Sequence, residues 1–189
     1  TVLAEVLAGD HRSDEIKARD PSRHPAETLA FFGMEPDMAV IEITPSAGWY
    51  TQVIAPYIAK GGGTYYAAHI DPNGAPEFML RGLERFEEMV SDPVYGDVSI
   101  VTHGANVEDM VPEGTVDMVV TFRNIHNWMP RDFAEKSFAL MYKALKPGGI
   151  LGVVEHRASD AEAQDPKAAS GYVREDYAIS NVAVVRDVT

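Results

Sequence analysis

The stretch from Met38 to Pro72 constrains the fold more than any other part of this chain, because apolar runs and turn-forming residues alternate in it in a fixed order. An apolar run at 39–43 predicts a strand, and a turn containing Pro and Gly follows it. Apolar residues then recur at helical spacing up to three glycines at 61–63, and 64–70 has the composition of a second strand. A strand, helix and strand of this length form the nucleotide-binding half of a doubly wound α/β sheet, whose first turn lies under the ligand.

The rest of the chain continues this alternation. Helical spacing of apolar residues predicts helices over 77–90 and 133–145. Apolar runs predict three further strands, over 98–102, 116–121 and 150–155. Strands that alternate with helices predict a doubly wound, mostly parallel, Rossmann-like sheet with right-handed crossovers.

The pattern divides the chain into two parts. Residues 1–33 are expected to form a helical segment that covers the site, and 34–189 the sheet domain. Four basic residues of the first part, Arg12, Lys17, Arg19 and Arg23, interleave with acids. This interleaving predicts a solvated helix face and not a basic patch.

Composition excludes several kinds of partner and site. With 29 acidic and 16 basic residues, the net charge is -13, which repels phosphate backbones and argues against a nucleic-acid partner. The chain has no cysteine, so a thiol nucleophile, a disulfide framework and a cysteine-ligated zinc site are excluded. No apolar run is long enough to span a bilayer, so we expect no membrane partner. Composition leaves the compartment open between the cytoplasm and an exported location.

Several motifs in a fixed order resemble the class I S-adenosylmethionine-dependent methyltransferases. They are an acid that ends the first strand, a turn with Gly, IDP after the second strand, a VDMVV strand, and LKPGG before the last strand. The segments RHPAETLAFFG, GWYT, FRNIHNW and GYVRED resemble a group of bacterial proteins predicted to be methyltransferases, many of them predicted to be exported. The resemblance covers 23–176. It implies S-adenosylmethionine as cofactor, a small molecule as methyl acceptor, and export to the periplasm.

The resemblance also implies where the cofactor lies. The family's strand-end acid falls on Glu42, and its three turn glycines fall on Thr44, Ser46 and Gly48, so one glycine remains. The acid that holds the ribose falls on His69, with Asp71 two residues later, and the polar residue near the adenine falls on Asn106. Trp49 and Tyr50 open the next helix, where backbone donors face the methionine carboxylate; alternatively they pack under the N-terminal segment.

The segment 122–128 is the predicted centre of the chemistry, because methyltransferases of this fold place acceptor-binding groups after the fourth strand. His126 is a candidate general base and Asn124 a candidate donor and acceptor to the substrate. Further substrate contacts are expected from Arg123 and Trp128 and, as lid residues, from Tyr172 and Arg174. A bracing role for His126 and a buried structural role for Trp128 remain as alternatives.

Four histidines fall at predicted carboxyl ends of strands: His69, His103, His126 and His156. In the methyltransferase strand order, His69 is expected near His103, and His126 near His156. Such histidines act as general bases or metal ligands, or they form hydrogen bonds to loops. No short ligand motif is present, so no metal site is predicted.

The sequence therefore favours a small-molecule methyltransferase. Two alternatives remain: a methyltransferase-fold protein that has lost the cofactor and binds another ligand or a partner, and an enzyme that uses the histidines for another reaction. The family closes its sheet with a C-terminal antiparallel hairpin, for which few residues follow Asp176. We therefore expect this hairpin to be missing or shortened, and the exposed sheet edge makes a homodimer possible.

Overall fold

The computed structural model describes residues 1–157 and Val173, and the structural statements below concern these residues. The helices are α1 (Val2–Ala8), α2 (Asp14–Lys17), α3 (Asp20–Arg23), α4 (Pro25–Phe32), α5 (Thr51–Gly61), α6 (Glu77–Val90), α7 (Ile125–Trp128) and α8 (Ala134–Ala144), with two 3-10 turns, η1 (Pro93–Tyr95) and η2 (Met129–Arg131). The strands are β1 (Ala39–Ile43), β2 (Thr64–Ile70), β3 (Val98–His103), β4 (Val116–Phe122) and β5 (Leu145–Val154).

The five strands form one parallel sheet in the order β3-β2-β1-β4-β5, which confirms the predicted doubly wound, Rossmann-like fold. β1 is central, and its Ile41 pairs with Tyr66 of β2 and Val119 of β4. Because all strands run the same way, their carboxyl ends meet at one edge, where ligands of such sheets bind.

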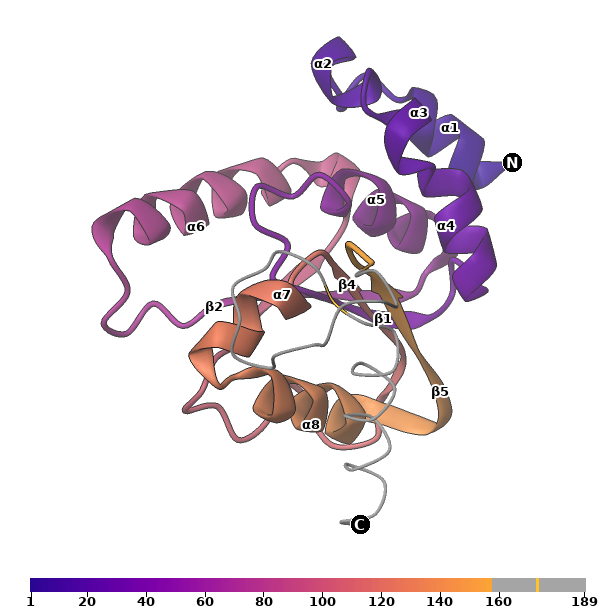
Figure 1. The fold of residues 1–189 in the computed structure, drawn as a ribbon. Helices are drawn as coiled ribbons and strands as arrows, with labels where there is room; N and C mark the ends of the chain where they lie inside the picture. The colour runs from indigo at the N-terminus through magenta and orange to yellow at the C-terminus, as the bar shows by residue number, and fades with distance from the viewer. Residues whose placement is uncertain (158–172, 174–189) are drawn as a thin grey trace.

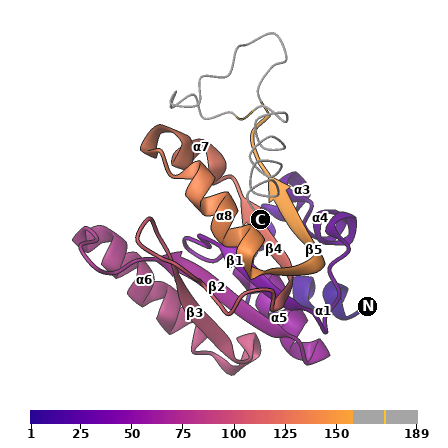
Figure 2. The same ribbon diagram turned by 90° about the horizontal axis from the view of Figure 1, so that it is seen from below.

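Helices cover both faces of the sheet (Figures 1 and 2). α5 and α6 lie on one face, together with the N-terminal helices, and α7 and α8 lie on the other. Each face has its own apolar core, and Val40 and Met118 belong to the first while Ile41 and Val119 belong to the second. Neighbouring residues of one strand therefore point to opposite faces of the sheet, and only side chains on the same face can meet.

The N-terminal helices pack on the start of α5 through polar contacts. Trp49 donates its indole Nε1–H to the carbonyl oxygen of Ile16 at 3.2 Å, and the Tyr50 hydroxyl donates to that of Arg23 at 3.2 Å. The guanidinium of Arg12 is buried and pairs with both carboxylate oxygens of Asp20. The prediction of a solvated helix face is therefore wrong for Arg12, because this guanidinium joins two helices beneath the surface.

Element boundaries follow the sequence within about one residue, except at β5. The strand begins at Leu145, not at Ile150, and α8 ends at Ala144. Leu145 pairs with Val116, and a register irregularity follows before Met118 pairs with Ile150. The LKPGG run therefore enters the sheet instead of forming a separate turn before it.

The predicted C-terminal hairpin and the candidate lid residues Tyr172 and Arg174 lie outside the described residues. Throughout 1–157, every helix falls short of the length and apolar content that crossing a bilayer requires.

Candidate functional site

The turn between β1 and α5 has a backbone of the kind that glycine usually adopts, although two of the residues that adopt it are Thr44 and Ser46. Thr44, Ser46 and Gly48 all have left-handed φ angles, of 50°, 55° and 79°. Such angles are unfavourable for residues with a Cβ, most of all for a β-branched Thr, and cost on the order of 1–2 kcal/mol each. Strain of this kind is retained where the surrounding structure or a ligand requires the conformation.

His69, at the predicted ribose position, forms a hydrogen bond to this turn. Its Nδ1 accepts from the backbone N–H of Ile70 at 2.9 Å, so its Nε2–H donates to the Ser46 carbonyl oxygen at 3.2 Å. The ring is buried against Phe86, with ring centroids 5.0 Å apart. Burial lowers the pKa of His69, which keeps this ring neutral.

Side chains of α6 lie directly over the turn. A Cβ at Gly48 would come within 2.5 Å of the Met89 methyl carbon and 3.2 Å of the Phe86 ring. The backbone of the turn therefore fits close approach by a ligand, while the space beside it is filled by Met89, Phe86 and His69. A ligand at this turn would have to displace the flexible Met89 side chain and open the hydrogen bond between His69 and Ser46.

The other predicted cofactor residues lie apart from this turn. Glu42 is buried between β1 and α5, where its Oε2 accepts from the Thr51 hydroxyl at 2.8 Å and the Tyr65 hydroxyl at 2.5 Å. Burial raises the pKa of Glu42 to about 7. Asp71 accepts from the backbone N–H and side-chain amide of Asn73, both at 2.9 Å, and Asn106 is exposed in the loop after β3.

His126 forms a half-buried pair with Glu155 after the ends of β4 and β5. The imidazole Nδ1 lies 2.7 Å from the Glu155 Oε1, and the backbone N–H of His126 donates to Oε2 at 3.3 Å. The His156 ring lies beside it, with centroids 5.7 Å apart, which confirms the predicted proximity of these two histidines. Because a carboxylate only accepts, Nδ1 carries a proton in this contact, and in the neutral ring Nε2 holds the lone pair.

The sequence identified His126 but did not pair it with Glu155. The signal was present, because each residue follows the end of its strand, and β4 and β5 are neighbours in the predicted order. Orientation by a carboxylate is a common way to hold a histidine as a base, so Glu155 is an added member of the site.

The side chains of Asn124 and Trp128 are buried and contact other residues of the chain. The Asn124 Nδ2 donates to the Ile43 carbonyl oxygen and the Thr121 hydroxyl, both at 3.0 Å, which joins the end of β4 to the end of β1. Trp128 is buried beside the rings of His103 and Phe133. The alternative of a buried structural role for Trp128 agrees with this position.

The predicted proximity of His69 and His103 is wrong. His69 pairs with Thr102, and His103 pairs with Ile70, so the two histidines point to opposite faces of the sheet. His103 bridges the Thr44 hydroxyl, 3.3 Å from its Nδ1, and the Ser137 hydroxyl, 2.8 Å from its Nε2. Burial lowers the pKa of His103 to about 4. Within 1–157 and at Val173, no three histidine or acidic side chains converge as a metal site.

Comparisons with known proteins bear on the fold. No protein-family model and no curated protein matches the chain. Among solved structures, a SAM-dependent methyltransferase from Aquifex aeolicus is 20% identical with a TM-score of 0.65, over 90% of this chain and 86% of that protein. The cyclase SpnF is 12% identical with a TM-score of 0.65, over 97% of this chain and 66% of that protein.

A third structure carries a ligand. The glycopeptide N-methyltransferase MtfA, complexed with S-adenosylhomocysteine, is 15% identical with a TM-score of 0.52. The alignment covers 74% of this chain and 51% of that protein, so the chain spans about half of its length. At these identities the comparisons show that the chain has the class I methyltransferase fold.

Proposed function

We propose that this chain is an S-adenosylmethionine-dependent methyltransferase that acts on a small molecule. The observation that carries the proposal is the turn after β1, where Thr44, Ser46 and Gly48 all keep the left-handed conformation that the family builds from glycines. Strain of this kind is retained where the surrounding structure or a ligand requires it, and the hydrogen bonds of Thr44 to Ala68 and His103 hold the turn in this conformation ready for a ligand.

The cofactor, when bound, supplies an activated methyl group. The backbone of the turn between β1 and α5 is proposed to hold an anionic group of the ligand. His126 is placed to accept a proton from a hydroxyl or amine acceptor at its Nε2, while the Glu155 carboxylate holds Nδ1 and stabilises the imidazolium that results. Methyl transfer further requires that the two reactants are positioned in a site from which water is excluded. The N-terminal helices, residues 1–33, are proposed to exclude this water.

A second candidate is a protein with this fold that no longer binds the cofactor and binds another ligand. The close packing of Met89, Phe86 and His69 over the turn favours it. The fold itself does not discriminate, since one fold carries many functions and one protein of similar fold is a cyclase.

Titration calorimetry with S-adenosylhomocysteine tests the proposal. We expect measurable but weak binding by the natural protein, and tighter binding by His69→Asp, because an aspartate accepts hydrogen bonds from both ribose hydroxyls. Charge-assisted hydrogen bonds of this kind predict a gain of about tenfold to a hundredfold.

His69→Asn is the matched control, because it has the size of aspartate without its charge, and it is expected to show no comparable gain. Circular dichroism verifies that each variant is folded. If neither the natural protein nor His69→Asp binds the ligand at millimolar concentration, the methyltransferase proposal is wrong and the second candidate stands.

A further inference from the structure

Three arginines near the site have no acidic partner in the described part of the chain. The ion pairs of arginine side chains there join Arg12 to Asp20 and Arg81 to Glu77. Arg19, Arg23 and Arg123 form none with residues 1–157, although the chain has 29 acidic and 16 basic residues. In such an acidic protein, arginines that form no ion pair and lie close together produce a local positive field.

Two of these arginines, Arg23 and Arg123, flank Tyr50. The Arg23 guanidinium carbon lies 4.5 Å from the centre of the Trp49 ring, and the Arg23 carbonyl oxygen accepts from the Tyr50 hydroxyl. Tyr50 stacks on Phe122, with centroids 3.5 Å apart and planes 8° apart, and Arg123 is the next residue.

The positive charges of Arg123 and Arg19 act on Arg23. The pKa of Arg23 is lowered first by burial and then by the positive charges of Arg123 and Arg19. The backbone of Arg123 is also left-handed, with φ 58°, at the end of β4. An anion that joined the two guanidinium groups would relieve the repulsion between them.

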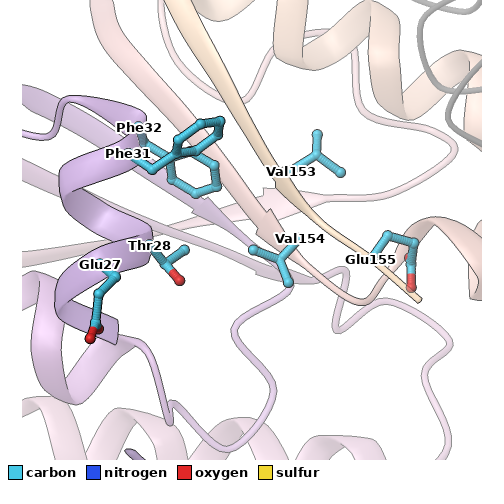
Figure 3. A pocket seen from close by; sticks show the side chains of 7 residues that line it. All are labelled: Glu27, Thr28, Phe31, Phe32, Val153, Val154 and Glu155. Carbon is cyan, nitrogen blue, oxygen red and sulfur yellow. The ribbon is translucent and has the colours of Figure 1, made fainter. Parts of the chain in front are cut away.

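A groove lies between α4 and the edge strand β5 (Figure 3). Its volume is about 420 Å³, within the range of small-molecule sites. Its walls are mostly apolar, with Phe31 87% exposed. The residues that line it are Glu27, Thr28, Phe31, Phe32, Val153, Val154 and Glu155.

Hydrogen bonds connect both walls of the groove to the backbone of the two arginines. On α4, the Thr28 hydroxyl donates to the Arg23 carbonyl oxygen at 3.5 Å. On β5, the Val154 carbonyl oxygen accepts from the backbone N–H of Arg123 at 2.7 Å. Of the two lining carboxylates, that of Glu155 is paired with His126, and the side chain of Glu27 is 74% exposed and 4.0 Å from His24.

We propose that this groove, with Arg23 and Arg123 at its border, binds a small molecule that has an apolar body and an anionic head group. The apolar body packs on Phe31, Phe32 and Val154, and the head group is held by the two guanidinium groups. The inference rests on the proposed function only in taking this molecule to be the methyl acceptor. Glu155 lines the groove and holds His126, so the bound molecule lies next to the proposed base.

The test uses 3-phenylpropionate as probe and phenethylamine as its cationic counterpart of similar size, both titrated into the full chain by calorimetry. We expect the carboxylate to bind and the amine not to bind. Arg23→Gln and Arg123→Gln are each expected to weaken phenylpropionate binding about tenfold, as the loss of a charge-assisted pair predicts. Phe31→Ala is expected to weaken it severalfold through lost apolar contact.

Two controls match these variants on α6, away from the groove. Arg85→Gln removes an exposed arginine and Phe78→Ala removes a phenylalanine that is 65% exposed, and neither is expected to change probe binding. The proposal is overturned if the carboxylate fails to bind at millimolar concentration, if the amine binds equally well, or if Arg85→Gln matches the other arginine variants.

S-adenosylhomocysteine, which also has a carboxylate, is titrated separately. If Arg23→Gln and Arg123→Gln weaken its binding and leave phenylpropionate binding unchanged, the arginines serve the cofactor and the inference is wrong. If phenylpropionate binds as expected while S-adenosylhomocysteine does not bind at all, the groove is confirmed and the methyltransferase proposal fails.

Discussion

Replacement of Glu42 by glutamine is expected to stabilise the protein above pH 7, by at most about 3 kcal/mol. The carboxyl is buried and its pKa is raised from 4.5 to about 7, so ionising it in the folded state is unfavourable. The folded state then holds this proton more tightly than the unfolded state. The stabilisation that this bound proton contributes is fully present below pH 4.5 and is lost as the pH rises to about 7. Glutamine has no such loss, and its side-chain oxygen can still accept from Thr51 and Tyr65.

Urea unfolding of both proteins between pH 4 and pH 8 measures this difference. The advantage of Glu42→Gln over the natural protein is expected to grow between pH 4.5 and 7 and to level off above. Glu27→Gln is a suitable control, since it makes the same substitution at an exposed carboxyl. A Glu42→Gln difference that stays flat with pH would show that Glu42 is not a buried titrating acid.

The order of elements and their faces could be predicted, because periodicity and turn residues determine them locally. The bounds of β1, β2 and α6 agree with their sequence patterns to the residue. The start of β5 could not be predicted in this way, because Pro147 and Gly148 indicate a turn. There the pairing of Leu145 with Val116, a long-range contact, decides the outcome.

Parts of the candidate site could be predicted where the position of a residue at a strand end is enough to place it. They could not be predicted where the direction of the side chain decides which residues meet. His126 and His156 meet because both follow neighbouring strand ends. His69 and His103 also end neighbouring strands, but their register differs by one residue, and that difference places them on opposite faces. A register between strands cannot be read from either strand alone.

The left-handed turn shows a further limit of sequence reasoning. Residue identity alone predicts a turn with another backbone, because Thr44 and Ser46 stand where the resembled family has glycines. The structure retains the conformation and fixes Thr44 through hydrogen bonds of its N–H to Ala68 and of its hydroxyl to His103. Tertiary contacts thus maintain a conformation that local preference opposes.

Replacement of Asp20 by alanine is expected to release the N-terminal helices, at a loss of about 3–5 kcal/mol in their stability. Arg12 has a fully buried side chain, and its two terminal nitrogens donate to the carboxylate of Asp20. Its Nε has no hydrogen-bond partner within the described structure, and besides Asp20 the guanidinium donates to the Leu7 carbonyl oxygen at 2.9 Å, so Asp20 provides the only negative charge paired with it there. Without the carboxylate, Arg12 must reach water, and helices α1 to α3 must move for that to happen.

Hydrogen exchange of residues 1–33, with and without the substitution, measures this release directly. The double variant Arg12→Met, Asp20→Ala is expected to recover much of the protection, because an apolar side chain at position 12 needs no partner and still packs near Trp49. Glu77→Ala, which breaks an exposed pair, is the control and is expected to change stability by less than about 1 kcal/mol. Equal effects of Asp20→Ala and Glu77→Ala would contradict a buried ion pair at Arg12.

Asp20→Ala is also expected to weaken phenylpropionate binding. Ile16 and Arg23 accept hydrogen bonds from Trp49 and Tyr50, so release of the N-terminal helices also displaces Arg23 from the groove.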